Sequence, residues 1–268
     1  MRIIGRLDIK GANVIKGIQF ECLRVMGLPA EMAENYYLQG ADEIIYIDTV
    51  ASLYGRSMIK DIVRETSSKI HIPLIAGGGV RKIKDIEDLL NAGADKVAIN
   101  TAAIKNPSLL SDAANRFGSQ CIVSSIQAKK INNNKWESYI DSGREKTGLD
   151  VIDWAKKVQR LGVGEILLTS IDRDGTESGL DEELINEVSK ITKISLVVSG
   201  GVSNPNDYIK CSSNLKVDGI AAGTIFHYNK FRFDEIKKSL VRKNNKLNIR
   251  SIKINSKLNN IEDKIIIL

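Results

Sequence analysis

Apolar runs without polar alternation recur along the chain, and residues with helical spacing separate them. Such runs are typical of strands that are buried on both faces, which belong to parallel sheets covered by helices. Eight candidate strands can be read, at residues 2–7, 43–47, 72–76, 96–99, 120–126, 165–169, 195–198 and 219–222. Helical spacing marks segments such as 30–39, 83–91, 107–117 and 151–161. This alternation predicts a closed (β/α)8 barrel, with a doubly wound open sheet as the alternative.

An internal repeat supports the barrel. Residues 40–45 (GADEII) are echoed by 162–167 (GVGEIL), and residues 78–80 (GGV) by 200–202, both at an offset of 122 positions. Residues 8–10 (DIK) are echoed by 127–129 (QAK) at the nearly equal offset of 119. We therefore expect two similar half-barrels of four βα units each, closing one barrel with no linker between them.

Composition suggests one domain and a tail. A chain of 268 residues with 43% hydrophobic content is long enough for a single barrel. We expect the barrel over residues 1–243 and a Lys/Asn-rich C-terminal extension over 244–268. Much of the net charge of +6 comes from residues 237–264, where no aromatic side chains are interleaved. This pattern favours a solvated tail and no nucleic-acid partner.

The sequence contains no apolar run as long as a membrane span, and its charged first residues do not form a signal sequence. We expect a cytoplasmic protein with no membrane partner. Cys22, Cys121 and Cys211 lack CxxC spacing, and only two histidines accompany them. We therefore predict neither a disulfide framework nor a metal site, and no cofactor.

Glycine-rich loops follow strands in both halves. Gly77, Gly78 and Gly79 follow the third expected strand, and Asn100 and Thr101 follow the fourth. The second half supplies the matching set Ser199, Gly200, Gly201, Gly223 and Thr224. Glycine lets backbone N–H groups approach an oxyanion, although tight βα turns need glycine in any case. The two symmetric copies predict a phosphorylated small-molecule substrate with a phosphate at each end.

Polar residues also follow the sixth expected strand. Residues 172–176 (DRDGT) come directly after the apolar run that ends at Thr169. Chemistry in such barrels takes place at the C-terminal ends of the strands, so Asp174 and Gly175 are candidate substrate-binding residues together with Thr169. A solvated loop with a helix cap is the alternative.

Several longer strings resemble the cyclase subunit of imidazole glycerol phosphate synthase, HisF. They are residues 7–10 (LDIK), 14–17 (VIKG), 77–79 (GGG), 95–103 (DKVAINTAA), 117–120 (FGSQ) and 164–176 (GEILLTSIDRDGT), and the match runs from about residue 2 to about residue 227. The resemblance implies a barrel that receives ammonia from a HisH-like glutaminase docked at its N-terminal face. The ammonia then attacks a doubly phosphorylated, nucleotide-like substrate, which is cyclised and cleaved to imidazole glycerol phosphate and an aminoimidazole ribotide.

The resemblance assigns catalytic positions. In the family, aspartates after strands 1 and 5 act as general acid and base, and a strand-1 loop lysine closes over the substrate. The matching residues are Asp8 and Lys16, but the second aspartate position is Gln127. An amide does not exchange a proton at ordinary pH, so this departure predicts a divergent member with impaired cyclisation. The alternative is that Gln127 only hydrogen-bonds in the site while Asp8 or Asp174 covers both roles.

Arg6 is a second departure, because the family usually has a small residue there. It lies two residues before Asp8 and therefore on the same inward face of strand 1. A guanidinium inside a barrel needs a partner, and Asp8 is the nearest candidate. Such pairing would keep Asp8 ionised and reduce its use as an acid. Alternatively, Arg6 could bind an anionic group of the substrate.

The other end of the barrel matches the family pattern. Arg2, Glu43, Lys96 and Glu165 each stand at the start of an expected strand. By resemblance they form the charged ring through which ammonia enters, and two cations with two anions can pair as a closed gate. Asp95 matches a residue that helps to dock the glutaminase. A solvated barrel floor is the alternative.

Three functions follow from these patterns. The first is a HisF-like subunit that conducts ammonia from a HisH-like glutaminase to another acceptor. Relatives in surface-glycan loci imply an acceptor such as a nucleotide-linked sugar. The second is a working cyclase of histidine biosynthesis that tolerates Gln127. The third is a non-catalytic scaffold that activates the glutaminase.

Overall fold

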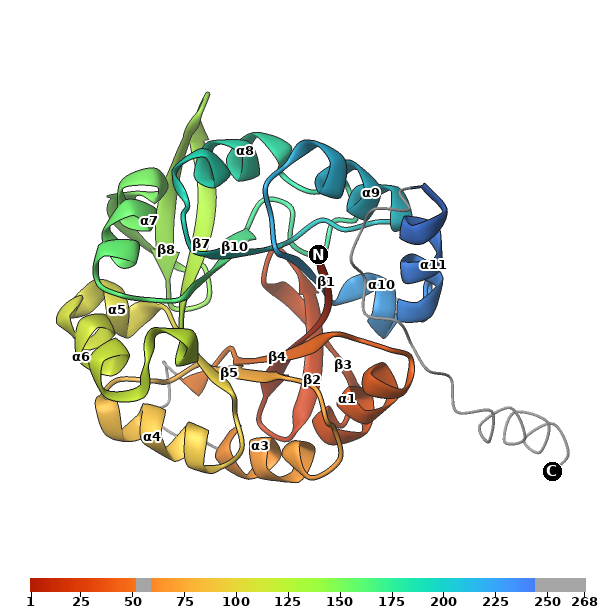
Figure 1. Ribbon diagram of the computed structural model, residues 1–268, viewed down its shortest axis with the longest axis horizontal. Coiled ribbons are helices and arrows are strands. Elements are labelled where there is room, and N and C mark those ends of the chain that lie inside the picture. The colour runs from red at the N-terminus through yellow and green to blue at the C-terminus, as the bar shows by residue number, and fades with distance from the viewer. Residues whose placement is uncertain (52–58, 244–268) are drawn as a thin grey trace, which may run out of the picture.

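The fold is a closed barrel of parallel strands in a computed structural model that describes residues 1–51 and 59–243. Its strands are β1 (Arg2–Lys10), β4 (Glu43–Asp48), β5 (Leu74–Gly77), β6 (Lys96–Ile99), β7 (Ile122–Asn132), β10 (Glu165–Ser170), β11 (Ser195–Ser199) and β12 (Gly219–Ala222). The order β10-β11-β12-β1-β4-β5-β6-β7 is closed by the β7–β10 pairing (Figure 1). Within the described chain, the predicted (β/α)8 barrel is confirmed and the open sheet is excluded.

Helices surround the barrel (Figure 1). They are α1 (Pro29–Leu38), α3 (Ile59–Ser67), α4 (Ile83–Asn91), α5 (Thr101–Lys105), α6 (Ser108–Phe117), α7 (Val151–Arg160), α8 (Glu182–Ile191), α9 (Pro205–Asn214), α10 (Thr224–His227) and α11 (Phe233–Lys243). The four predicted helices correspond to α1, α4, α6 and α7, with ends that differ by at most one residue.

Local chemistry explains why these helices form where they do, and α7 is a clear case. The Asp150 carboxylate caps its start by accepting hydrogen bonds from the backbone N–H groups of Ile152 and Asp153 at 2.8 and 3.1 Å. This satisfies donors that have no partner within the helix. Val151, Trp154, Ala155 and Val158 share one buried face. Their spacing places that face against the barrel.

Two apolar layers result from the alternation of side chains along the strands. One lies between the strands and the helices and is the larger of the two. The other fills the barrel interior and takes residues from every barrel strand: Ile4, Ile45, Ile47, Ile75, Ala98, Val123, Leu167, Val197 and Ala221. The barrel is therefore packed across its middle, and only its two ends are polar.

Four antiparallel strands were not predicted. They are β2 (Asn13–Ile18), β3 (Glu21–Gly27), β8 (Lys135–Ile140) and β9 (Glu145–Asp150). β2 pairs with the end of β1, and β8 pairs with the end of β7. Two barrel strands thus continue past the barrel into small antiparallel sheets at its C-terminal face. Two strand starts also differ from prediction, because β5 begins after Pro73 and β7 follows the 3-10 turn η1 (Ser119–Cys121).

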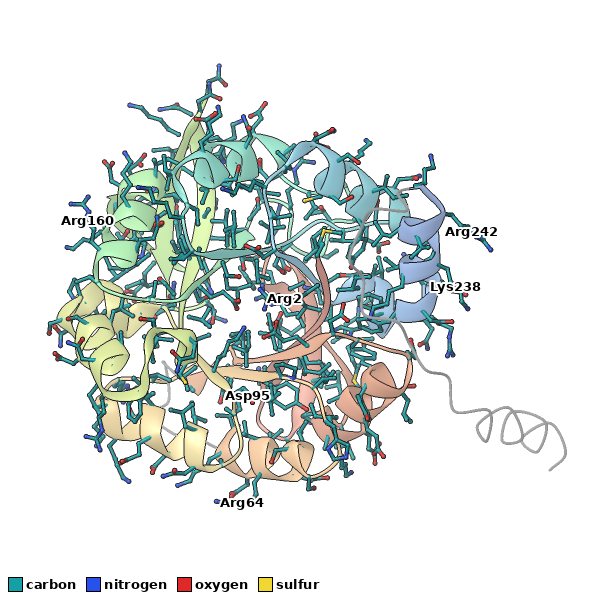
Figure 2. All side chains as sticks on the ribbon, in the orientation of Figure 1. Arg2, Arg64, Asp95, Arg160, Lys238 and Arg242 are labelled. Atoms are coloured by element: carbon teal, nitrogen blue, oxygen red, sulfur yellow. The ribbon has the colours of Figure 1, made fainter. Side chains whose placement is uncertain are left out.

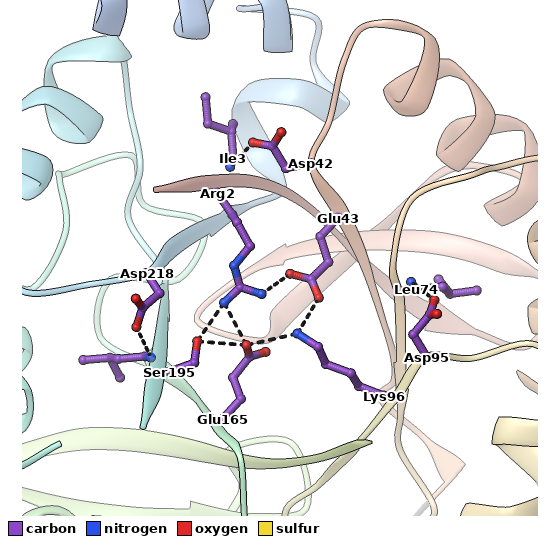
Figure 3. Close-up of polar contacts among 11 residues, drawn as sticks. Arg2, Ile3, Asp42, Glu43, Leu74, Asp95, Lys96, Glu165, Ser195 and Asp218 are labelled. Atoms are coloured by element: carbon purple, nitrogen blue, oxygen red, sulfur yellow. Dashed lines mark hydrogen bonds and ion pairs between the residues drawn. The ribbon is translucent and has the colours of Figure 1, made fainter. Parts of the chain in front are cut away.

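The half-barrel repeat extends to individual contacts. The Asp95 carboxylate accepts a hydrogen bond from the backbone N–H of Leu74 at 2.8 Å, and Asp218 accepts one from Leu196 at the same distance. Both pairs join the starts of neighbouring strands in equivalent positions (Figure 3). The expected extension at residues 244–268 lies outside the described residues. Among those described, no helix has the length and apolarity needed to cross a membrane.

Candidate active site

The inward face of β1 contributes side chains to both ends of the barrel. Arg2, Ile4, Arg6 and Asp8 follow one another along the barrel axis because alternate residues of a strand face the same side. Arg2 lies at the N-terminal end of the barrel, which we call the floor, and Asp8 at the C-terminal end, which we call the mouth. Ile4 belongs to the apolar interior between them. Charged groups thus flank an apolar layer on both sides.

Four charges from four strands meet at the floor. Arg2 binds the carboxylate of Glu43 and donates to Glu165 Oε2 at 2.7 Å. Lys96 Nζ donates to Glu43 Oε1 at 2.8 Å and to Glu165 Oε2 at 3.1 Å. The four side chains therefore form a closed ring (Figure 3), and Arg2 lies in the centre of the barrel (Figure 2). The structure shows the pairing that the alternating signs allow, whereas a role in ammonia entry remains a prediction.

Ser195 joins this ring and was missed from the sequence. Arg2 Nη2 donates to its hydroxyl oxygen at 2.9 Å, and the hydroxyl in turn donates to Glu165 Oε2 at 3.0 Å (Figure 3). Its position at the start of the seventh barrel strand could have revealed it. Burial raises the pKa of Glu43, and the nearby charges of Arg2 and Lys96 oppose that rise. The opposite charges of the four side chains therefore stabilise one another in the ring.

Asp95 lies beside the ring and is exposed. One of its carboxylate oxygens already serves the fold by accepting from the backbone of Leu74 (Figure 3). Its role at an interface with a glutaminase stays a prediction.

The first half of the mouth contains a cavity of about 430 Å³. The predicted residues Gly79, Asn100, Thr101 and Gln127 line it, together with Asp141. Asn100 Nδ2 donates hydrogen bonds to backbone oxygens of two neighbouring strands, at 2.9 and 3.1 Å. Thr101 exchanges hydrogen bonds with Asp141 at 3.2 and 3.1 Å. Asp141 was missed because it follows β8, a strand that the sequence did not indicate.

Glycine is required at two positions of the loop that lines this cavity. Gly78 and Gly79 have φ values of +99° and +70°, a region that side chains disfavour. A Cβ on Gly78 would also lie 2.3 Å from the backbone oxygen of Asp48. The loop therefore lines the cavity with backbone in a conformation that residues with a side chain disfavour.

Gln127 is buried with an unsatisfied acceptor. Its side chain is 5% exposed, and its Oε1 has no hydrogen-bond partner among the described residues. Because an unpaired buried acceptor is costly, this oxygen is suited to a donor that enters the cavity. Gln127 contributes hydrogen-bonding capacity to the site and no proton transfer.

The second half of the mouth is closed. Only about 20 Å³ of space remains there, although Gly175, Ser199, Gly201, Gly223 and Thr224 line it as predicted. Lys16 Nζ donates to both carboxylate oxygens of Asp174 at 3.0 and 2.9 Å, and both side chains are buried. Their contact was missed from the sequence because Lys16 lies on β2, a strand that the sequence did not indicate. Asp172 lies apart from this cavity and accepts from the backbone N–H of Lys130 at 2.8 Å.

Arg6 occupies the centre of the mouth and is 4% exposed. Its Nε donates to Asp8 Oδ1 at 3.0 Å, so the predicted pairing is confirmed. Its Nη1 donates to Thr169 Oγ1 at 2.9 Å and to Ser199 Oγ at 3.2 Å. Two hydroxyls that were predicted to bind substrate therefore bind a side chain of the protein.

Electrostatics keep Asp8 ionised. Burial alone would raise its pKa, but the charges of Arg6 and Lys16 outweigh burial and hold the pKa below its usual value. Asp8 is thus a carboxylate that can accept a proton or stabilise a cation. His227 lies nearby. Burial and the charge of Lys16 lower its pKa to about 4, and the charge of Asp8 opposes this shift. Its Nδ1 is 2.6 Å from the hydroxyl of Tyr36.

Comparisons with known proteins agree with this arrangement. The family model for "Histidine biosynthesis protein" matches residues 2–232. Imidazole glycerol phosphate synthase subunit HisF of Legionella pneumophila is 56% identical over 208 residues, which cover 78% of this chain and 98% of that protein. The subunit of the same name from Bacillus cereus strain G9842 is 46% identical over 239 residues, covering 89% of this chain and 95% of that protein. The chain therefore belongs to the family of imidazole glycerol phosphate synthase subunit HisF.

Proposed function

We propose that this chain is the synthase subunit of a HisF-type glutamine amidotransferase. In this proposal a HisH-type glutaminase docks at the floor, ammonia passes the charged ring, and an acceptor in the mouth takes it up. The observation that carries the proposal is the closed ring of Arg2, Glu43, Lys96 and Glu165 at the barrel axis. Neutral ammonia can cross the apolar layer above it, whereas a charged ion would lose its hydration there.

The first candidate reaction is the cyclisation of imidazole glycerol phosphate synthase in histidine biosynthesis. The names of the relatives support this reaction more than any other. Asp8 would act as the base because it is ionised at neutral pH, although its lowered pKa makes it a weaker proton acceptor than an ordinary carboxylate. Lys16 would neutralise phosphate charge once it leaves Asp174. Asn100 and Thr101, fixed at the cavity, would orient the substrate.

The second candidate is a reaction at another acceptor, such as amidation of a nucleotide-linked sugar. Two observations support it. Gln127 stands in the mouth where the family pattern has a proton-transferring aspartate, and Arg6 binds Asp8, Thr169 and Ser199. A scaffold with an idle mouth is the least supported alternative, since the cavity of about 430 Å³ has the size of a ligand site and contains an unpaired acceptor.

An assay of the purified chain with the cyclase substrate and an ammonium salt distinguishes the two reactions. Rapid formation of the imidazole product by the wild type supports cyclisation. Under the second candidate, the wild type is slow and Gln127→Asp gains about a hundred- to ten-thousand-fold in rate, the usual contribution of a positioned proton-transfer group.

The control for this assay is Gln120→Asp, which makes the same chemical change at an exposed position. No product from any variant, together with no effect on a glutaminase, would overturn the proposed function.

A further inference from the structure

One position of the floor recurs four times around the barrel, directly before β4, β6, β10 and β12. It is occupied by Asp42, Asp95, Gly164 and Asp218. Each of the three carboxylates accepts a hydrogen bond at 2.8 Å from a backbone N–H of the preceding barrel strand. The same contact between neighbouring strands is thus repeated around the floor.

Two of these carboxylates are exposed. Asp42 is buried, and its second oxygen accepts from Lys237 of α11. A Cβ on Gly164 would lie 2.4 Å from a backbone oxygen, so the position before β10 has no room for a side chain. Asp95 and Asp218 are exposed and use Oδ2 for the contact between strands. Their Oδ1 atoms have no partner within the described part of the chain, so both remain available to another molecule.

Asp95 and Asp218 lie on opposite sides of the charged ring (Figure 3). They precede the fourth and the eighth strand of the barrel, which are half a turn apart. Each also adjoins one cation of the ring. Lys96 follows Asp95 in the chain, and the backbone N–H of Arg2 donates to the carbonyl oxygen of Asp218 at 2.8 Å. The two free carboxylates therefore flank the ring symmetrically.

The ring between them contains an acceptor without a partner. Glu165 is 4% exposed, and its Oε1 has no hydrogen-bond partner among the residues that the structure describes. An unpaired buried acceptor is costly, so this oxygen is suited to a small N–H donor that reaches the ring. A partner that delivers ammonia must then place its outlet over the ring and not over another part of the floor.

We propose that Asp95 and Asp218 together dock one partner subunit, which carries a basic side chain on each side of its ammonia outlet. Charged pairs across an interface fix its register. Two pairs on opposite sides of the ring would centre the partner on the barrel axis and stop it from turning, whereas one pair would leave it free to turn. This inference rests on the proposed function. It adds Asp218 to the docking surface and specifies the charge of the partner's face.

The test is a calorimetric titration of a HisH-type glutaminase with this chain and its variants. Asp218→Asn removes the charge but keeps an oxygen for the backbone N–H of Leu196, and it should weaken binding about fivefold or more. Asp95→Asn should act similarly, and the double variant should multiply the two losses because the sites are far apart. Asp112→Asn removes an exposed carboxylate on α6 and should leave the affinity unchanged.

Hydrogen–deuterium exchange of the wild-type complex is a second measurement, which needs no variant. We expect slower exchange at residues 93–95 and 216–218 when the glutaminase binds, because both loops would be covered. Wild-type affinity of Asp218→Asn, or protection at 93–95 alone, would overturn the inference. The same protection in the concentrated chain without glutaminase would also overturn it, since a second copy would then occupy the floor. These results from a chain that still binds the glutaminase would reject only this inference, whereas absence of any complex would reject the proposed function as well.

Discussion

Arg6 Nε lies 3.0 Å from Asp8 Oδ1, so two inward residues of one strand form a buried ion pair at the mouth. The pair affects both the stability of the fold and the ionisation of Asp8. It keeps Asp8 ionised, the aspartate to which the resemblance assigns a catalytic role, and it places a cation where the sequence comparison led us to expect a small side chain.

Arg6→Ala should lower the free energy of unfolding at pH 7 by about 3 kcal/mol, because it leaves the Asp8 charge buried with less compensation. The pKa of Asp8 is depressed in the folded protein, so the contribution of the pair is present above the unfolded pKa and is lost as pH falls through the folded pKa. The deficit should therefore shrink in acid. Arg6→Met combined with Asp8→Asn should recover most of the loss, as measured by urea titration.

The control for this prediction is Arg64→Ala, which removes an exposed contact with Asp61 at 3.0 Å on an outer helix (Figure 2). We expect it to cost less than about 1 kcal/mol, because such surface pairs contribute little. Equal losses in both variants would contradict a special role for the buried pair.

Lys96→Met should destabilise the floor, because Arg2 would then be the one cation of the ring that faces both Glu43 and Glu165. We expect a loss of about 2 kcal/mol at pH 7, in line with the cost of an unpaired buried polar group. Burial already raises the pKa of Glu43, and losing Lys96 raises it further, so protonation of Glu43 should relieve the loss as the pH falls. Lys156→Met on the exposed side of α7 is the matched control, and a loss that is constant with pH would contradict the charge argument.

Gly175→Ala should loosen the contact between β2 and the loop that follows β10. The residue has a φ of +72°, and its Cβ would lie 2.2 Å from the backbone oxygen of Gly17. Gly148→Ala has the same backbone strain at a φ of +71°, with nothing within 4 Å, and should cost only about 1–2 kcal/mol. Faster hydrogen exchange in residues 13–27 is expected for the first variant only, and equal exchange in both would contradict the packing explanation.

His227 should make the protein sensitive to mild acid. Its pKa is lowered to about 4 in the folded state, so the unfolded chain binds a proton first and stability falls between about pH 6.5 and 4. The full effect is up to about 3 kcal/mol, from the size of the shift. His227→Gln should flatten this part of the stability curve. His71→Gln changes the other, exposed histidine and should leave the curve unaltered.

The barrel could be predicted because its strands are buried on both faces, so most of them carry an apolar run, although Arg6, Asp8 and Gln127 interrupt two of them. The antiparallel strands could not, since β3 is mostly exposed and β9 contains charged residues and Gly148. Neither has an apolar face that the sequence can signal. Their formation depends on β1 and β7 continuing past the barrel, which is a property of the tertiary structure.

Some contacts of the site could be predicted from local sequence patterns, and others depend on the tertiary structure. The contact of Arg6 with Asp8 was predictable from the period of a strand. The ring was predicted from four charges at strand starts that match the pattern of the resembled family. The contact of Lys16 with Asp174 was not, because only the folded β2 brings them together. The unequal cavities also could not be foreseen, since a repeated sequence predicts two equal halves.

The most direct test of the proposed function is to titrate a HisH-type glutaminase with this chain and to measure glutamine hydrolysis. We predict a stable complex and a rise in hydrolysis that saturates at one chain per glutaminase. Asp95→Asn should weaken the complex while keeping the acceptor for the backbone of Leu74, and Asp153→Asn on α7 should have no effect. Absence of both a complex and stimulation at saturating concentrations would contradict the assignment of this chain as an ammonia-using subunit.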